Sequence, residues 1–170
     1  MTAADRNRDG AQVFDPAGIQ WTPVSPRLAA VRRTGLAMVV AVLALAVVVL
    51  SLVLGWPWLL AALLVPALTG VAGWITINRQ VRAWGYAERA DDLLIRRGVM
   101  FRELVVVPYG RMQFVDVKAG PLDRAFGVAQ VQLHTASAAT DARIPGLGAA
   151  EAARLRDRLA SRGQARLAGL

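Results

Sequence analysis

The chain has 170 residues, a hydrophobic fraction of 55% and a formal net charge of +8. It contains no cysteine, which excludes disulfides, thiolate catalysis and cysteine-based zinc or iron–sulfur sites. Nothing resembling a recognition helix or an aromatic-basic binding motif accompanies the positive charge, so we expect anionic lipid rather than nucleic acid beside it, although a high-GC genome alone also accounts for abundant arginine.

Residues 1–26 show no hydrophobic period and are predicted to form a disordered cytoplasmic tail. They are not read as a signal peptide, because the first apolar run begins only at residue 36. Two prolines exclude a regular helix from residues 21–26, and Trp21 is expected at the level of the lipid headgroups.

The 45 residues from Thr34 to Asn78 include no charged side chain. Gly55, Trp56 and Pro57 interrupt this stretch and leave two apolar segments, residues 36–54 and 58–77. Each is about 28 to 30 Å long as a helix, close to the hydrocarbon thickness of a bilayer. Residues 27–83 are therefore predicted to form a two-helix transmembrane hairpin, in preference to a buried core helix of a soluble protein.

Arginines lie just outside both ends of this hairpin, whereas its connecting loop carries no charge. Both termini of a multi-pass protein of the plasma membrane are therefore predicted to be cytoplasmic. Pro66 lies in the interior of the second span and is expected to kink that helix. Because neither span contains an ionisable side chain, Pro66 and the glycines near it are expected to serve packing rather than transport. The residues expected to anchor the hairpin at the membrane interfaces are Trp56, Trp58, Arg32, Arg33, Arg79 and Arg82.

From residue 84 onward the pattern changes to short alternating segments. In residues 128–135, for example, Ala129, Val131 and Leu133 are expected to face inward. Residues 147–161 have the period of an amphipathic helix, and residues 163–170 are predicted to be a disordered tail. The pattern predicts a small barrel or strongly bent sheet covered by a C-terminal helix. The strands are predicted at residues 86–90, 92–97, 99–107, 112–118, 128–135 and 142–145, with a short helical segment at 122–126.

No arrangement of residues indicates catalysis, a metal or a cofactor, and the chain is predicted not to be an enzyme. Asp91 and Asp92 point to opposite faces of a strand and are read as turn residues. The single histidine, His134, has no second histidine near it and is read as a surface residue. Ser137 lacks a histidine–carboxylate pattern, and the glycines of residues 120–127 match neither phosphate-binding motif.

Residues 91–137, DDLLIRRGVMFRELVVVPYGRMQFVDVKAGPLDRAFGVAQVQLHTAS, resemble the bacterial pleckstrin-homology-like (PH-like) domain of the YdbS-like membrane proteins. The matching pieces are the Arg97-Gly98 strand end, P-x-x-R-x-Q-x-V-D-V at residues 108–117 and G-P-L-x-R-x-F-G at residues 120–127. The resemblance covers about residues 84–160, and the hairpin before them also fits the group. The chain departs from the pattern at Met112, where an isoleucine is expected, and in its Ala-rich loop at residues 136–141.

This resemblance implies a membrane α-helical hairpin followed, at residues 84–162, by a mainly-β PH-like open barrel capped by a C-terminal helix. It implies a non-enzymatic protein-interaction or scaffold module at the membrane; the alternative is a module that binds anionic lipid headgroups. A membrane enzyme or transporter subunit is less favoured, because no converging set of polar residues is found.

Arg111, Gln113 and Arg124 are the polar positions at which a partner or headgroup contact is expected. The other interpretation of these three residues is a hydrogen-bond network that holds the loops of the barrel. The expected partners are the lipid bilayer, a larger membrane protein with repeated PH-like domains, and a second copy of the chain in a homo-oligomer.

Overall fold

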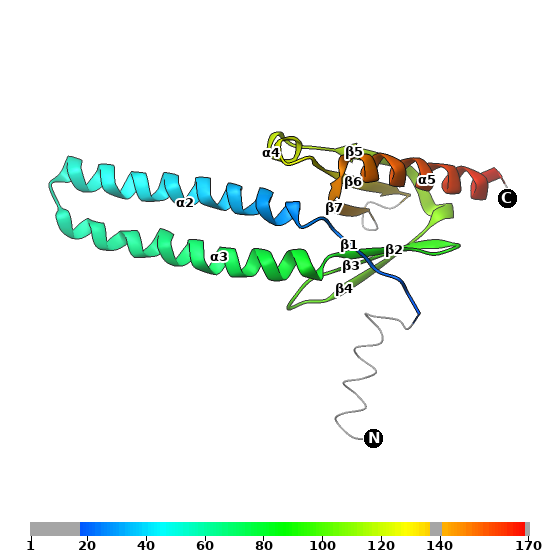
Figure 1. Cartoon of the computed structure of the whole chain (residues 1–170), viewed down its shortest axis with the longest axis horizontal. Helices are drawn as coiled ribbons and strands as arrows, with labels where there is room; N and C mark the ends of the chain where they lie inside the picture. Colours follow the sequence, from blue (N-terminus) through cyan, green and yellow to red (C-terminus); the bar gives the residue numbers. More distant parts are fainter. Residues whose placement is uncertain (1–17, 137–140, 169–170) are drawn as a thin grey trace, which may run out of the picture. The chain divides into compact units, whose positions relative to one another are not determined.

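The computed structural model describes residues 18–136 and 141–168, and it divides the chain into two compact units. One unit is Ala29–Arg79. The other joins the residues up to Leu28 with those from Gln80 onward, so it is built from two separate stretches of the sequence (Figure 1). The first unit is called the hairpin below, and the second is called the domain.

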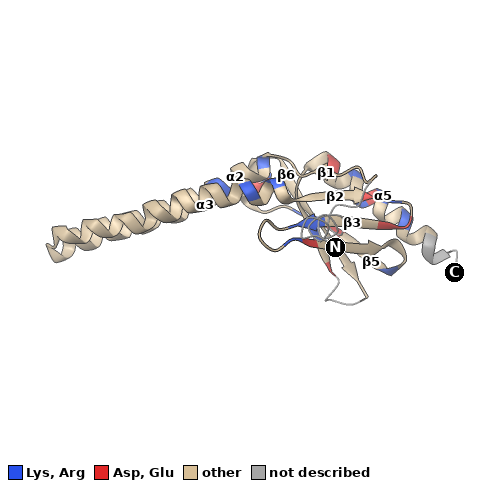
Figure 2. Ribbon diagram, turned by 90° about the horizontal axis from the view of Figure 1, so that it is seen from below, with Lys and Arg blue, Asp and Glu red and all other residues tan. Residues whose placement is uncertain are grey.

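The hairpin is formed by α2 (Arg27–Leu54), the 3-10 helix η1 (Pro57–Leu63) and α3 (Leu64–Ala83). The first two residues of α2 and the last four of α3 belong to the domain. Both helical segments are long and apolar enough to cross a membrane. In each segment, only 6% of the apolar stretch of 18 residues is buried by other parts of the protein, whereas the core helix of a soluble protein would be mostly buried. Lysine and arginine are confined to one end of the two helices (Figure 2). The predicted membrane hairpin is confirmed.

Glycines of α3 face α2 within the hairpin. A Cβ atom added to Gly73 would lie 2.6 Å from Cδ2 of Leu36, and one added to Gly70 would lie 3.7 Å from Val40. These glycines therefore let the two helices approach closely. Pro66 was predicted to kink the interior of the second helix, and this prediction is wrong. Pro66 lies in the first turn of α3, directly after η1, where proline is tolerated.

In the residues that the structure describes, the domain contains two antiparallel sheets. The first has the order β1-β2-β3-β4 and the second the order β5-β6-β7. The strands of the first are β1 (Thr22–Pro23), β2 (Gly85–Glu88), β3 (Asp92–Arg97) and β4 (Glu103–Pro108). Those of the second are β5 (Met112–Lys118), β6 (Val128–Thr135) and β7 (Ala142–Gly148), with η2 (Tyr109–Arg111) before β5 and α4 (Pro121–Ala125) after it.

The helix α5 (Ala149–Ala168) packs against η2, β5 and β6 and covers the core. Ala152, Leu155 and Leu159 of α5 are fully buried, as are Val131 and Leu133 of β6. The periods predicted for the helix and for β6 are therefore confirmed. Two sheets closed by a C-terminal helix are the predicted architecture. However, α5 continues past Ser161 to Ala168, so the tail predicted from residue 163 is wrong as far as residue 168.

The segment before the hairpin belongs to the domain. Thr22 and Pro23 of β1 pair with Tyr86 and Gly85, and the Ser25 amide donates to the Gly146 carbonyl at 2.9 Å. The Arg96 guanidinium lies over the Trp21 ring, with its central carbon 4.6 Å from the ring centroid, so Trp21 contacts the domain. The prediction of a disordered tail is therefore wrong for residues 18–26, while the rest of that prediction lies outside the described residues.

The third predicted strand also begins later than expected. Residues 98–102 form a turn, and β4 starts at Glu103. Gly98 has a φ of +96°, and a Cβ atom there would lie 1.8 Å from the Phe101 carbonyl oxygen. Only glycine fits this position without displacing the turn.

Candidate functional site

The strand β5 forms one edge of the second sheet. It pairs with β6, and no other strand in the described part of the chain pairs with its outer edge. Val115 lies opposite Leu133 and Val117 opposite Val131, so both valines face the core. Because side chains alternate along a strand, Phe114, Asp116 and Lys118 face away from the core.

The outer face of the sheet carries a group of four side chains, Phe114, Asp116, His134 and Asp141, which we call the Phe114 patch. The Phe114 ring stacks on His134 with centroids 4.2 Å apart, and 53% of its surface remains exposed. His134 lies between two carboxylates, with Nδ1 3.0 Å from Oδ2 of Asp141 and Nε2 3.6 Å from Oδ2 of Asp116. His134 is thus on the polar face, as predicted, but held by its neighbours.

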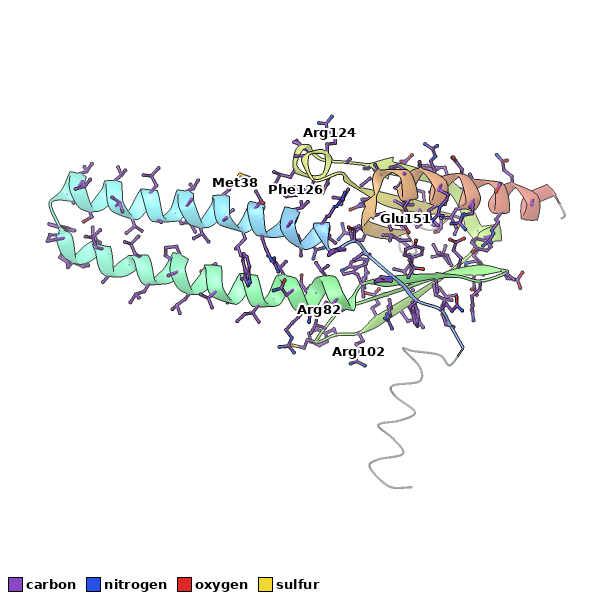
Figure 3. The ribbon with its side chains drawn as sticks, viewed as in Figure 1. Met38, Arg82, Arg102, Arg124, Phe126 and Glu151 are labelled. Atoms are coloured by element: carbon purple, nitrogen blue, oxygen red, sulfur yellow. The ribbon has the colours of Figure 1, made fainter. Side chains whose placement is uncertain are left out.

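Two of the three residues singled out from the sequence lie beside this patch. Arg111 ends η2, and Gln113 follows within the irregular start of β5, where the register shifts. Arg124 lies in α4, beyond the other end of β5 (Figure 3). The seven residues of β5 lie between Arg111 and Arg124, which corresponds to roughly 20 Å of strand. The structure therefore brings Arg111 and Gln113 together and leaves Arg124 apart.

The side chains of Arg111, Gln113 and Arg124 are exposed, and none makes a hydrogen bond or ion pair with another residue in the described ranges. Other residues hold the neighbouring loops. The Gly120 amide donates to Oδ2 of Asp123 at 3.0 Å, and the Tyr109 hydroxyl donates to the Arg89 carbonyl at 3.0 Å. Within the described part of the chain, the alternative of a loop-holding network therefore has no contact to support it.

Two arginines of α5 are engaged within the domain. Arg158 and Arg162 lie 3.3 and 3.5 Å from the carboxylate of Glu88 on β2. Arg162 also donates to the Tyr109 hydroxyl at 2.8 Å. These cations therefore fasten α5 to the first sheet, which leaves fewer of them for an external anion.

Tyr86 forms a second link between β2 and α5. Its hydroxyl donates to Oε1 of Glu151 at 2.7 Å. Burial raises the pKa of Tyr86, and the hydrogen bond to the Glu151 carboxylate raises it further. The hydroxyl therefore stays protonated at neutral pH and acts as a structural donor.

Asp91 and Asp92 hold the turn between β2 and β3, Asp92 through its carboxylate and Asp91 through its backbone carbonyl. Asp92 pairs with the Arg89 guanidinium through two hydrogen bonds of 2.6 and 2.5 Å. The Asp91 carbonyl accepts from the Tyr109 amide at 3.1 Å. No group of three or more possible metal ligands occurs among the residues that the structure describes. Ser137 lies outside them.

The predicted interface anchors have different surroundings. Trp56 and Trp58 are exposed at the tip of the hairpin and stack on each other, with centroids 5.8 Å apart. Arg33 lies over the Trp74 ring, 4.1 Å from its centroid, and donates to Oδ1 of Asn78. Arg33 therefore links α2 to α3. Of the others, Arg32 is half-buried in α2, while Arg79 and Arg82 are exposed in α3.

Sequence reasoning did not find the Phe114 patch. Phe114 and His134 lie twenty residues apart, and they meet only because the register of β5 with β6 places them opposite each other. The alternation in each strand predicts which side chains face outward, but no pattern within either strand predicts that Phe114 lies opposite His134.

Comparison with known proteins gives two matches. A family model described as "Bacterial PH domain" matches residues 27–163. The chain is also similar to the UPF0699 transmembrane protein YdbS of Bacillus subtilis (strain 168), with 37% identity over 116 residues, which cover 66% of this chain and 72% of that protein. No solved structure matches.

Proposed function

The chain belongs to the bacterial PH domain family, and on that basis we propose that it is a non-enzymatic membrane protein whose PH-like domain binds a protein partner and retains it at the membrane. The hairpin provides the anchor, and the domain provides the binding surface. The expected partners are a larger membrane protein with repeated PH-like domains, and a second copy of this chain.

The exposed edge of β5 is the observation that carries this proposal. It combines a half-exposed aromatic ring, Phe114, with two side chains that have no partner among the described residues, Arg111 and Gln113. Aromatic residues and arginine are enriched at the centres of protein interfaces. The outer edge of β5 also leaves backbone groups that an extended segment of a partner can pair with.

Photo-crosslinking in native membranes tests this proposal. A photoreactive residue replaces Gln113 in the full chain, and the control carries it at Arg156, which is exposed on α5. We expect a protein adduct of discrete mass at position 113 that is lost when Phe114→Ala is added. Equal adducts at both positions, or adducts with lipid alone, would contradict a protein-binding role for β5.

Binding of an anionic lipid headgroup is the second candidate. It is favoured by the exposed guanidinium groups of Arg111 and Arg124, which lack partners among the described residues. Because β1 precedes the hairpin, binding is best measured on the full chain in detergent, with short-chain phosphatidylglycerol against phosphatidylcholine. Arg111→Ala or Arg124→Ala should weaken a salt-sensitive preference for phosphatidylglycerol, whereas Arg156→Ala should not.

We also propose that both termini lie in the cytoplasm, at the plasma membrane. The arginines outside both spans and the uncharged loop between them support this orientation. The pairing of β1 with β2 supports it further, because the strands on either side of the hairpin must then be on one side of the membrane. Reporters fused at residue 56 and at the C-terminus should report opposite sides, and the same side for both would disprove it.

A further inference from the structure

The turn between β3 and β4 exposes two large apolar side chains. Met100 and Phe101 are each 85% exposed, more than Leu52 of the first span at 77%. Within the described chain no other large hydrophobic residue is as exposed. Adjacent apolar side chains that are this exposed indicate a surface that contacts a membrane or another protein.

The backbone holds these two residues in a defined conformation. Gly98 supplies the positive φ of the turn, and its α-carbon lies against the Phe101 carbonyl. The base of the turn is closed by the pair of Arg97 and Glu103, whose two hydrogen bonds measure 2.8 and 2.9 Å. Exposure of Met100 and Phe101 is therefore a consequence of how the turn is built.

The register of the first sheet places this turn at the end of the domain where the chain arrives from the second span. Gly85, the first residue of β2, lies opposite Arg96, and the Arg97 guanidinium lies over the Trp84 ring at 5.9 Å. From Trp84 the chain runs back to the last apolar residue of the span, Ile77, over about 10 Å of helix. The turn itself extends beyond Arg97 by roughly 10 Å.

The side chains around the tip suit a membrane interface. Arg82 and Arg102 are exposed at this end of the domain, and neither pairs with another described residue (Figure 3). Apolar and aromatic side chains flanked by arginine are favoured where acyl chains meet anionic headgroups. An anionic bilayer supplies both the apolar cover and the negative charge that this combination of side chains suits.

We propose that Met100 and Phe101 insert into the cytoplasmic headgroup region of the same bilayer that holds the hairpin, and that Arg82 and Arg102 contact its anionic lipids. The tip then gives the domain a third attachment to the membrane besides the two spans. This attachment is separate from partner binding at β5, and it requires no partner protein.

The absence of cysteine from the natural sequence allows a direct test. The full chain with Met100→Cys carries an environment-sensitive fluorophore, in nanodiscs of phosphatidylcholine and phosphatidylglycerol. The matched control is Ala90→Cys, an exposed residue in the turn at the other end of β3. We expect the emission of the label at position 100 to be shifted to the blue. Brominated acyl chains should quench this emission, and aqueous iodide should not. The label at position 90 should show the reverse.

Two results would overturn the proposal. Equal quenching by iodide at positions 90 and 100 would mean that the tip lies in water. A label at position 100 that neither iodide nor brominated lipid quenches would mean that protein, such as a second copy of the chain, covers the tip. A label at Phe101→Cys repeats the measurement independently, and unfolding curves that match the unmodified chain show that each labelled protein is folded.

Discussion

Leu28 packs directly on Gly146. Leu28 is 5% exposed, and a Cβ atom added to Gly146 would lie 2.6 Å from Cβ of Leu28. Gly146 also has a φ of +70°, and its carbonyl accepts the hydrogen bond from the Ser25 amide. The segment that precedes the hairpin is therefore fixed to β7, a strand that follows the hairpin in the sequence.

Gly146→Ala should destabilise the domain, because it combines a disfavoured backbone conformation with a clash against Leu28. The backbone term alone is about 1 to 3 kcal/mol. A lower midpoint of thermal unfolding in detergent is expected. Gly148→Ala in the same strand is the control, since a Cβ atom there would meet nothing within 4 Å. Similar midpoints for the two variants would show that Leu28 does not pack there in solution.

Asn78→Ala should loosen the hairpin. The Asn78 side chain accepts a hydrogen bond from Arg33, which lies partly buried over Trp74. Loss of the acceptor leaves a charged donor without its partner, at a cost of about 1.5 to 3 kcal/mol. Unfolding of the detergent-solubilised protein by added SDS measures this loss. Arg79→Ala, which removes an exposed cation with no described partner, should change it little.

Stability should fall above pH 10 because of Tyr86. Burial and the Glu151 carboxylate raise the pKa of Tyr86 in the folded state, so the unfolded chain loses this proton first. The stabilisation is fully present below the unfolded pKa of about 10 and is lost as pH rises towards the folded value. Urea unfolding between pH 8 and 11 should show the decline. Tyr86→Phe should flatten it, and an unchanged slope would assign the decline to other groups.

Gly98→Ala should both destabilise the domain and alter the β3–β4 turn. The added Cβ atom has no room beside the Phe101 carbonyl, and the positive φ adds about 1 to 3 kcal/mol. Thermal unfolding measures the first effect, and renewed iodide quenching of a label at position 100 measures the second. Gly110→Ala is the control, because nothing lies within 4 Å of its Cβ position. A Gly98→Ala protein as stable as this control would refute the clash.

The elements that could be predicted are those with a signal inside one segment. A long uncharged stretch suffices to identify the hairpin, and the alternation in β6 and the apolar stripe of α5 identify their buried faces. The strand β1 has only two residues, one of them Pro23, and its partner Gly85 lies beyond the whole hairpin. No local pattern can report such a pairing. The end of α5 was predicted too early for a related reason. A glycine often marks the end of a helix, but Gly163 is buried within α5 near the Tyr109 carbonyl.

The division of the domain by the hairpin has a consequence for how the chain is made. The ribosome synthesises Leu28 first and reaches Gly146 only 118 residues later. At ordinary rates of translation this interval is on the order of ten seconds. Both spans emerge within it, so the domain closes after the hairpin has entered the bilayer. A chain that inserts only one span leaves β1 across the membrane from β2, and its incomplete domain exposes core residues to the proteases that remove unfolded protein.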